Sequence, residues 1–306
     1  MGWTAAELPD LPGRTALVTG GNSGLGLETA RALAARGATV LIACRSEAKA
    51  RQAVQDIRRD SPEARLGFLP LDLSDLASVR RCAEQFAATQ ARLDILCNNA
   101  GVMATPEDKT RDGFETQFGT NHLGHFALTG LLMPQLRATP GARVVVVSSL
   151  AHRSGPHRLH DPNWERSRYS PAAAYGWSKL ANLMFALELD RRLRKAGIET
   201  KAVAAHPGYT ATNIGFGDFT APTSLKGRVM QLGNRLLAQS AAWGALPTLY
   251  AATATDVQGG EYIGPDGPLE FRGHPVRVRP NRHAADLDAA ARLWALSEQL
   301  TGVRYP

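Results

Sequence analysis

The stretch Thr19-Gly-Gly-Asn-Ser-Gly-Leu-Gly26 follows the apolar run Thr15-Ala-Leu-Val-Thr19 and opens an alanine- and leucine-rich segment that Gly37 ends. This pattern predicts a buried strand, a tight turn and a helix over residues 24–36. Glycines here allow a sharp bend, close approach of a ligand and packing of helix on strand. The start of the helix presents free N–H groups and a positive dipole end, which suit a pyrophosphate. The alternative is a glycine-rich turn that binds no ligand. The position of this turn between the first strand and the first helix favours a dinucleotide-binding site.

Short apolar runs alternate with longer helical patterns along the rest of the chain. Further strands are expected over residues 39–43, 67–71, 94–97, 143–147 and 200–205, and around 262–263. Helices are expected over residues 46–59, 74–89 with Ser74 as N-cap, 113–137, 172–196, 240–254 and 284–301. Because such alternation builds right-handed βαβ units, the predicted fold class is α/β, a doubly wound parallel sheet with helices on both faces.

No linker or internal repeat divides the 306 residues, so a single domain over residues 1–306 is expected. Its dinucleotide-binding half covers about residues 13–150. The alternation is interrupted over residues 151–171 and 210–234, each after the carboxyl end of an expected strand. Since long loops at such positions usually bind ligands, we predict that these two segments form the walls of a substrate pocket.

Composition excludes several classes of protein. With 44% hydrophobic and 21% charged residues, the chain is neither disordered nor fibrous. The three cysteines, Cys44, Cys82 and Cys97, form no close pair, which indicates reduced thiols and argues against zinc. No apolar run reaches the ~18 residues of a membrane span and no signal-peptide pattern is present, so we expect no membrane anchor and a cytoplasmic location. The net charge of +7 is scattered along helix faces among acidic residues, so no nucleic-acid partner is expected.

The glycine spacing is Gly20-x-x-x-Gly24-x-Gly26 rather than the commoner G-x-G-x-x-G. The motifs that follow it, in order, are Asp72, Asn98-Asn-Ala-Gly101, Asn121, Ser148-Ser149, Tyr175-Gly-Trp-Ser-Lys179 and Pro207-Gly208. Over nearly the whole chain this series resembles the short-chain dehydrogenase/reductase family. The segments Asn121-His-Leu-Gly-His-Phe126, Val147-Ser-Ser-Leu-Ala-His152 and His206-Pro-Gly208 are most similar to its retinol dehydrogenase-like branch. The resemblance implies a Rossmann-type fold and a nicotinamide cofactor.

The end of the second strand indicates which nicotinamide cofactor is used. A carboxylate there would bind the ribose 2′-hydroxyl and repel a 2′-phosphate, but this chain has Arg45, with Lys49 one helical turn further on. A guanidinium can donate two charge-assisted hydrogen bonds to a phosphate, so NADP(H) is favoured over NAD(H). Glu47 argues the other way unless it pairs with Arg51 at i+4. Alternatively, Arg45 is only a solvated strand end.

The resemblance also assigns the cofactor-binding residues, with Asp72 at the adenine, Asn98, Ala100 and Gly101 around the adenosine ribose, and Thr212 at the nicotinamide carboxamide. The full predicted set is Gly20, Asn22, Ser23, Gly24, Leu25, Gly26, Arg45, Asp72, Leu73, Asn98, Ala100, Gly101, Tyr175, Lys179, Pro207, Gly208 and Thr212.

Moving a hydride between an alcohol carbon and nicotinamide requires that a proton also move to or from the oxygen. A free tyrosine has a pKa of about 10 and is a poor base at neutral pH. Tyr175 and Lys179 are four residues apart on one helical face, where the ammonium would lower the phenol pKa. The resemblance makes Tyr175 the acid/base, gives Lys179 the nicotinamide ribose, and lets Asn121 bind a water that relays protons to Lys179. By the same comparison Ser149 binds the substrate oxygen, and Ser148 supports the backbone.

Eight histidines raise the question of a metal, but His122 and His125 lack partners with ligand spacing, so no metal site is predicted. The predicted function is an NADP(H)-dependent oxidoreductase that interconverts a carbonyl and an alcohol on a largely apolar small molecule. One alternative is a tailoring ketoreductase or dehydrogenase of secondary metabolism, and another is a non-catalytic NADP(H)-binding regulator. The long helices over residues 116–137 and 172–196 could pair two chains into a homodimer, with a monomer as the other arrangement.

Overall fold

The computed structural model describes residues 2–210 and 239–305, and the description below applies to those residues. One eight-stranded sheet has the order β3-β2-β1-β4-β5-β6-β7-β8. All neighbouring strands from β3 to β7 pair in parallel, and β8 pairs antiparallel with β7 at the edge. The strands are β1 (Thr15–Thr19), β2 (Thr39–Cys44), β3 (Arg65–Pro70), β4 (Ile95–Asn98), β5 (Arg143–Val147), β6 (Lys201–Ala205), β7 (Tyr262–Pro265) and β8 (Pro275–Arg277). The predicted doubly wound parallel sheet is thus confirmed.

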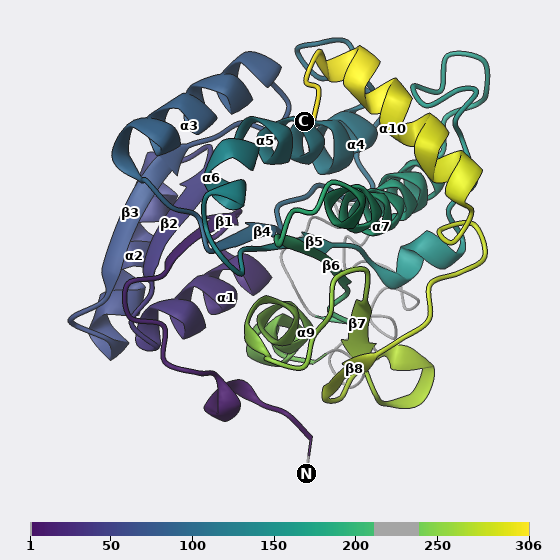
Figure 1. Cartoon of the computed structure of the whole chain (residues 1–306). Helices are drawn as coiled ribbons and strands as arrows, with labels where there is room; N and C mark the ends of the chain where they lie inside the picture. Colours follow the sequence, from purple (N-terminus) through teal and green to yellow (C-terminus); the bar gives the residue numbers. More distant parts are fainter. Residues whose placement is uncertain (1, 211–238, 306) are drawn as a thin grey trace, which may run out of the picture.

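Helices cover both faces of this sheet (Figure 1). The longer ones are α1 (Gly24–Ala35), α2 (Glu47–Asp60), α3 (Leu76–Thr89), α5 (Gly124–Leu131), α7 (Pro171–Lys195), α9 (Ala241–Thr253) and α10 (Leu287–Thr301). The short ones are η1 (Ala5–Glu7), α4 (Thr116–Phe118), η2 (Gly119–Leu123), α6 (Met133–Arg137), η3 (Leu150–Arg153) and η4 (Pro268–Glu270).

Alternate residues of each strand belong to the two halves of the core. Leu17 and Leu41 face the layer of α3, α5, α7 and α10, whereas Val18 and Ile42 face the layer of α1, α2 and α9. All five residues of β1 are buried, because helices cover the central strands from both sides.

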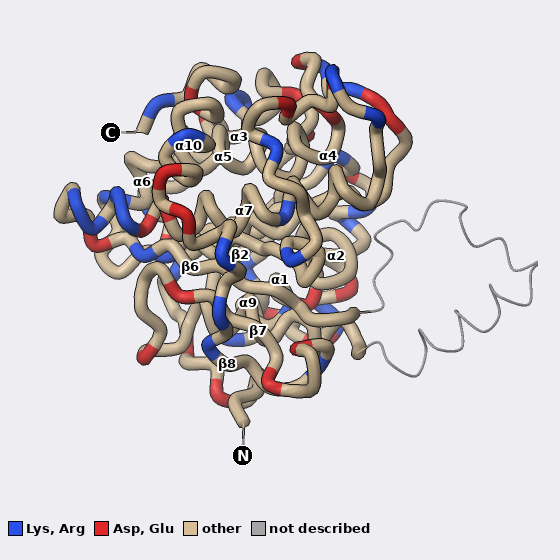
Figure 2. The backbone as a smooth tube through the Cα atoms, turned by 90° about the vertical axis from the view of Figure 1, so that its right-hand side faces the viewer, with Lys and Arg blue, Asp and Glu red and all other residues tan. Residues whose placement is uncertain are grey.

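The surface carries charges of both signs. Along the tube in Figure 2, lysine and arginine segments are interspersed with aspartate and glutamate. Within residues 2–210 and 239–305, no helix has both the length and the apolar character needed to cross a membrane. Cys44, Cys82 and Cys97 are each buried and free of disulfides.

Most long helices begin with a side-chain cap. Side-chain oxygens of the N-cap residues accept hydrogen bonds from backbone N–H groups at the start of α2 (Ser46), α3 (Asp75), α7 (Ser170), α9 (Ser240) and α10 (Asp286). Helix α1 differs, because its N-cap Ser23 makes no such bond. Its first N–H groups are therefore left for another acceptor.

Two predictions about helices are wrong. Asp75, not Ser74, caps α3; Ser74 Oγ instead donates to Asp72 Oδ1 at 2.6 Å. The single helix expected over residues 113–137 is divided into α4, the π-helical turn η2, α5 and α6. The buried ring of His125 bonds through Nδ1 to the carbonyl oxygen of Asn121 in η2 at 2.8 Å. This side chain therefore takes part in the backbone hydrogen bonding of the helix at the point where the turn is irregular.

The C-terminal helix α10 packs across the outer faces of α5 and α7 (Figure 1). Trp294 contacts Phe126 of α5 with ring centroids 5.1 Å apart and Phe185 of α7 with centroids 5.9 Å apart. The Tyr305 hydroxyl then donates to the Phe126 carbonyl oxygen at 2.7 Å. Every residue from 176 to 186 of α7 is buried within this one chain.

Candidate active site

A cavity of about 580 Å³ lies at the carboxyl ends of the parallel strands β1 to β6. This is the edge of an open α/β sheet where ligands bind. The predicted site residues that line it are Gly20, Asn22, Ser23, Gly24, Leu25, Gly26, Arg45, Asp72, Leu73, Ala100, Gly101, Tyr175, Lys179 and Pro207.

The glycine turn shapes one side of the cavity. Gly20 and Gly24 have φ angles of 67° and 53°, a conformation that glycine adopts without strain. A Cβ on Gly26 would lie 2.4 Å from the Gly20 carbonyl oxygen, so only glycine lets α1 pack on the turn. Since the uncapped start of α1 also faces the cavity, this side fits an anionic group such as a pyrophosphate.

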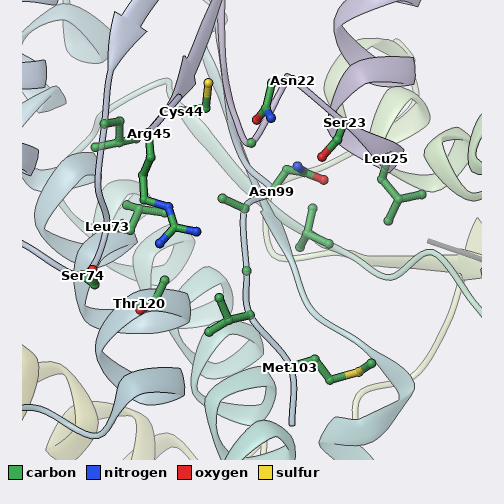
Figure 3. Close-up of a pocket in the computed structure, with 18 of the residues that line it drawn as sticks. Asn22, Ser23, Leu25, Cys44, Arg45, Leu73, Ser74, Asn99, Met103 and Thr120 are labelled. Atoms are coloured by element: carbon green, nitrogen blue, oxygen red, sulfur yellow. The ribbon is translucent and has the colours of Figure 1, made fainter. Parts of the chain in front are cut away.

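The end of β2 presents two cations to the same cavity. Arg45 and Lys49 are exposed and line the cavity, and the Arg45 guanidinium extends into it toward Leu73 (Figure 3). Glu47, which could have neutralised them, instead pairs with Arg51 at 2.7 Å, as its i+4 spacing predicted. The positive charge at this end is therefore not cancelled by Glu47.

The loops after β3 and β4 form the facing wall. Asp72 is half-buried and accepts from the Ser74 backbone N–H at 3.0 Å, which fixes its carboxylate beside the cavity. Asn98 is buried in β4, and its Nδ2 donates to Thr129 of α5 at 2.8 Å, so it does not line the cavity. Asn99 lines it instead, held by a 2.8 Å bond from its Nδ2 to the Thr19 carbonyl oxygen.

Tyr175, Lys179 and Ser149 meet at the end of β5. Tyr175 lies half-buried in the cavity wall, and its hydroxyl shares a hydrogen bond with the Ser149 side chain. Lys179 is 4% exposed, with Nζ 5.8 Å from the Tyr175 ring centroid and 3.1 Å from the Val147 carbonyl oxygen that accepts from it. Ser148 Oγ donates to the Lys179 carbonyl oxygen at 2.8 Å, which is the supporting role predicted for it.

Burial shifts the pKa values of Tyr175 and Lys179 in opposite directions. Burial raises the pKa of the Tyr175 phenol above its ordinary value of 10, and the Ser149 hydrogen bond offsets only part of that rise. Burial also lowers the pKa of Lys179 to about 8. The Lys179 ammonium, which bonds to Val147, is not among the causes of the Tyr175 shift, so the expected lowering of the phenol pKa by that ammonium stays a prediction.

Asn121 lies beside Lys179 but outside the cavity lining. Its Oδ1 accepts from the Val102 N–H at 2.8 Å, and its Nδ2 donates to the Val102 carbonyl at 2.9 Å and to Ser178 Oγ at 2.9 Å. A Cβ on Gly101 would lie 3.2 Å from Asn121 Oδ1 and 3.4 Å from Lys179 Nζ, which shows how closely the three approach. Asn121 therefore fixes the backbone at the cavity floor.

Comparison with known proteins identifies the family to which this arrangement belongs. The family model of short chain dehydrogenases matches residues 14–219. The chain is a short-chain dehydrogenase. It is 42% identical to mouse retinol dehydrogenase 12 over 297 residues, which cover 96% of this chain and 88% of that protein.

Two solved structures show the same fold as this dehydrogenase. The crystal structure of an uncharacterised protein from Mycobacterium paratuberculosis is 47% identical, with a TM-score of 0.83 and full coverage of both chains. An active-site complex of Pseudomonas aeruginosa RhlG with NADP is 26% identical, with a TM-score of 0.65 over 85% of this chain and 98% of that one. As a family member, this dehydrogenase is an oxidoreductase with a nicotinamide cofactor.

The cavity of the dehydrogenase fits such a cofactor along its length. The uncapped helix start suits the pyrophosphate, and the loops after β3 and β4 provide a place for the adenosine. Four predicted site residues are not among the described lining residues: Asn98, Asn121, Ser149 and Gly208, of which Gly208 has a φ of 68° and adjoins the lining residue Pro207. Thr212 falls outside the described residues, so its predicted role stays a prediction.

Sequence reasoning missed part of the lining, including Asn99, Ser148, Thr120 and the loop over residues 102–106. This loop continues directly from the predicted Gly101, so its position at the same sheet edge was the available signal. The predicted wall over residues 151–171 touches it, since the Tyr169 hydroxyl donates to the Thr105 carbonyl oxygen at 3.1 Å. Most of the other predicted wall, residues 210–234, lies outside the described residues.

Proposed function

We propose that this dehydrogenase interconverts a carbonyl and an alcohol on a largely apolar small molecule, uses NADP(H), and has Tyr175 as its acid/base. The observation that carries the proposal is that Tyr175 and Lys179 line the cavity that the glycine turn also lines, while Ser149 bonds to Tyr175 from outside the lining residues. Retinol, the alcohol that names a relative 42% identical to this chain, is an apolar alcohol.

The residues divide the chemistry among them. Ser149 and Tyr175 share a hydrogen bond, so a carbonyl oxygen placed between their hydroxyls would receive two donors as negative charge develops on it. When bound, the cofactor supplies the hydride. The Tyr175 phenol, whose pKa burial raises, would give its proton to the oxygen in carbonyl reduction and take one from it in alcohol oxidation. Lys179 donates to the Val147 carbonyl oxygen and Asn121 accepts from the Val102 N–H, so both side chains fix the backbone beside the reacting groups.

NADP(H) is favoured by the charges at the end of β2. Arg45 and Lys49 line the cavity, and Glu47 is paired with Arg51 instead. A 2′-phosphate would bind to cations that Glu47 leaves unpaired. The solved complex of RhlG with NADP supports the same choice by similarity of fold. The predicted cytoplasmic location stays a prediction.

The substitution Tyr175→Phe tests the function. With NADPH and a panel of aldehydes and ketones, turnover should fall by about 10²–10⁴-fold, the usual contribution of a general acid, while NADPH still binds. Tyr250→Phe is the matched control, because its hydroxyl bonds to Asp256 on the opposite face of the sheet, and it should leave turnover unchanged. Unaltered turnover in Tyr175→Phe would refute the mechanism. NADPH binding without turnover of any panel member in the wild-type protein would favour a regulator.

A further inference from the structure

A cluster of three hydrogen-bonded side chains lies behind the site, and we name its members, His206, Glu270 and Arg153, the Glu270 clamp. Glu270 accepts from His206 Nε2 at 2.9 Å through one carboxylate oxygen and from Arg153 Nη2 at 2.6 Å through the other. His206 is fully buried. Glu270 is not among the described residues that line the cavity, so any effect it has on the site passes through its partners.

The His206 ring ties the clamp to the turn after β6. The Gly208 backbone N–H donates to His206 Nδ1 at 3.2 Å, so Nδ1 carries no proton and the neutral ring has its hydrogen on Nε2, facing Glu270. Each ring nitrogen thus has one partner. A Cβ on Gly264 of β7 would lie 2.0 Å from His206 Nε2, so a glycine at this position leaves the room that the ring occupies.

The backbone around Glu270 is strained and fitted to the same turn. Leu269 and Glu270 have φ angles of 55° and 61°, which side-chain-bearing residues adopt only where the surroundings enforce it. A Cβ on Gly208 would lie 2.4 Å from the Phe271 carbonyl oxygen, and the Tyr209 N–H donates to that same oxygen at 2.7 Å. The strained segment therefore lies directly against the turn that carries Pro207 and Gly208.

Arg153 ties the clamp to the segment that bears Ser149. It is the last residue of η3, whose N-cap is Ser149, with Ser149 Oγ accepting from the Ala151 N–H at 3.2 Å. Within the same short helix, His152 Nδ1 bonds to the Ser149 carbonyl oxygen at 2.7 Å. One carboxylate therefore joins the Ser149 segment to the turn after β6.

We propose that Glu270 is a positioning residue that holds Ser149 and the Pro207–Gly208 turn in register at the nicotinamide end of the cavity. The inference rests on the proposed function, because it assumes that the nicotinamide lies at this end. In the sheet, β1, β4 and β5 separate β6, which the clamp adjoins, from β2, which Arg45 follows, so loss of the clamp should disturb the nicotinamide end and leave the adenosine end in place. That asymmetry separates a positioning role from a general loss of structure.

The affinities for two nucleotides distinguish the two ends of the cavity. NADPH reaches both ends, whereas 2′,5′-ADP lacks the nicotinamide. Glu270→Ala should weaken NADPH binding by about 3–10-fold and 2′,5′-ADP binding by less than about twofold. It should also lower kcat by about tenfold or more, because reacting groups displaced by a fraction of an ångström react slowly. Glu270→Gln should recover part of both losses, since its amide oxygen can still accept from His206. If the chain takes NADH, then NADH and ADP form the same pair of probes.

The matched control is Glu261→Ala. Glu261 precedes β7 on the same hairpin and pairs with Arg277 at 2.6 Å, with a side-chain exposure of 21% against 24% for Glu270. It should change neither nucleotide affinity nor kcat. If Glu270→Ala does not fold, Arg153→Ala removes only the arm to η3 and should lower kcat with little loss of unfolding temperature.

Equal weakening of both nucleotides, or wild-type affinity and kcat in Glu270→Ala and Arg153→Ala, would overturn the positioning role. Failure of the proposed function has a different signature. It would appear as full turnover in Tyr175→Phe, whereas the comparison of the two nucleotides needs no turnover at all.

Discussion

Lys179 is a cation held where water hardly reaches. The ammonium is 4% exposed and donates to the Val147 carbonyl oxygen, and burial lowers its pKa to about 8. In the unfolded chain the pKa of lysine is about 10.4. Between these two values the unfolded state binds more protons than the folded state, so the free energy of unfolding rises with pH in that window. Below about pH 8 the buried charge costs stability.

We expect Lys179→Met to unfold at a higher temperature than the wild type at pH 7, and the advantage to shrink as pH rises from about 8 toward 10.5. The reason is that the variant removes the buried charge that the wild type loses only by deprotonation. Thermal unfolding across this pH range measures it. Lys195→Met, at an exposed position of the same helix, should show no such trend. A Lys179→Met protein that is less stable by the same amount at every pH would contradict the expectation.

We expect a single residue, Arg45, to determine the preference for NADPH over NADH. Arg45→Ala should lower kcat/KM with NADPH by about 10–100-fold, the equivalent of a charge-assisted hydrogen bond, and leave kcat/KM with NADH nearly unchanged. Arg59→Ala is the control, because Arg59 is an exposed arginine in the last turn of the adjoining helix that pairs with Asp56 and leaves the Glu47–Arg51 pair intact. Steady-state kinetics with both cofactors provide the measurement. An equal loss with NADPH and NADH would show that Arg45 does not read the 2′-phosphate.

Some residues of the site could be read from the sequence and others could not. The pairing of Glu47 with Arg51 follows from local helix geometry alone, and it was predicted. The roles of the neighbours Asn98 and Asn99 could not be separated, because that depends on where β4 ends. Asn98 still belongs to the strand and its side chain reaches α5, whereas Asn99 has left the strand and faces the cavity.

Among the elements, β1 and β5 were predicted with their observed bounds, since apolar runs buried on both faces carry a strong signal. The division of residues 113–137 had no such signal. It accompanies a contact between distant parts of the chain: His125 bonds through Nδ1 to the Asn121 carbonyl and through Nε2 to Thr19 Oγ1 at 2.9 Å. The edge strand β8 is three residues long and lies among glycines and prolines, so it was also missed.

The hydrogen bonds of His125 connect the irregular turn η2 to the end of β1. Since His125 Nδ1 faces a carbonyl it must carry the proton, so Nε2 accepts from Thr19, and burial lowers the pKa of His125 to about 4. His125→Phe should lower the free energy of unfolding by about 1–3 kcal/mol, because it leaves buried partners unpaired. It should also lower turnover, because Asn121 loses its anchor.

The comparison variant is His122→Phe. His122 is equally buried, but its Nε2 bonds to Ser297 of α10 rather than toward the cavity. We expect a loss of stability with turnover retained. Denaturant unfolding and steady-state kinetics on both variants provide the measurement, and equal turnover in the two would remove any link between η2 and the site.

For the whole molecule we expect a single chain in solution. The pairing of long helices that the sequence allowed would need a free face on α5 and α7. Helix α10 occupies that face, and residues 176–186 of α7 are buried on every side. We therefore predict the mass of one chain by light scattering after size-exclusion chromatography at micromolar concentration. A mass of two chains would show that another surface pairs.

The contact between Tyr305 and Phe126 has a consequence for biosynthesis. These residues are 179 positions apart, yet the last aromatic rings of the chain complete the covering of a helix made in its first half. A ribosome will have released α5 long before it adds Trp294 and Tyr305. During that interval the aromatic face of α5 that Trp294 and Tyr305 later cover is exposed on the nascent polypeptide, and we expect chaperones to bind it there.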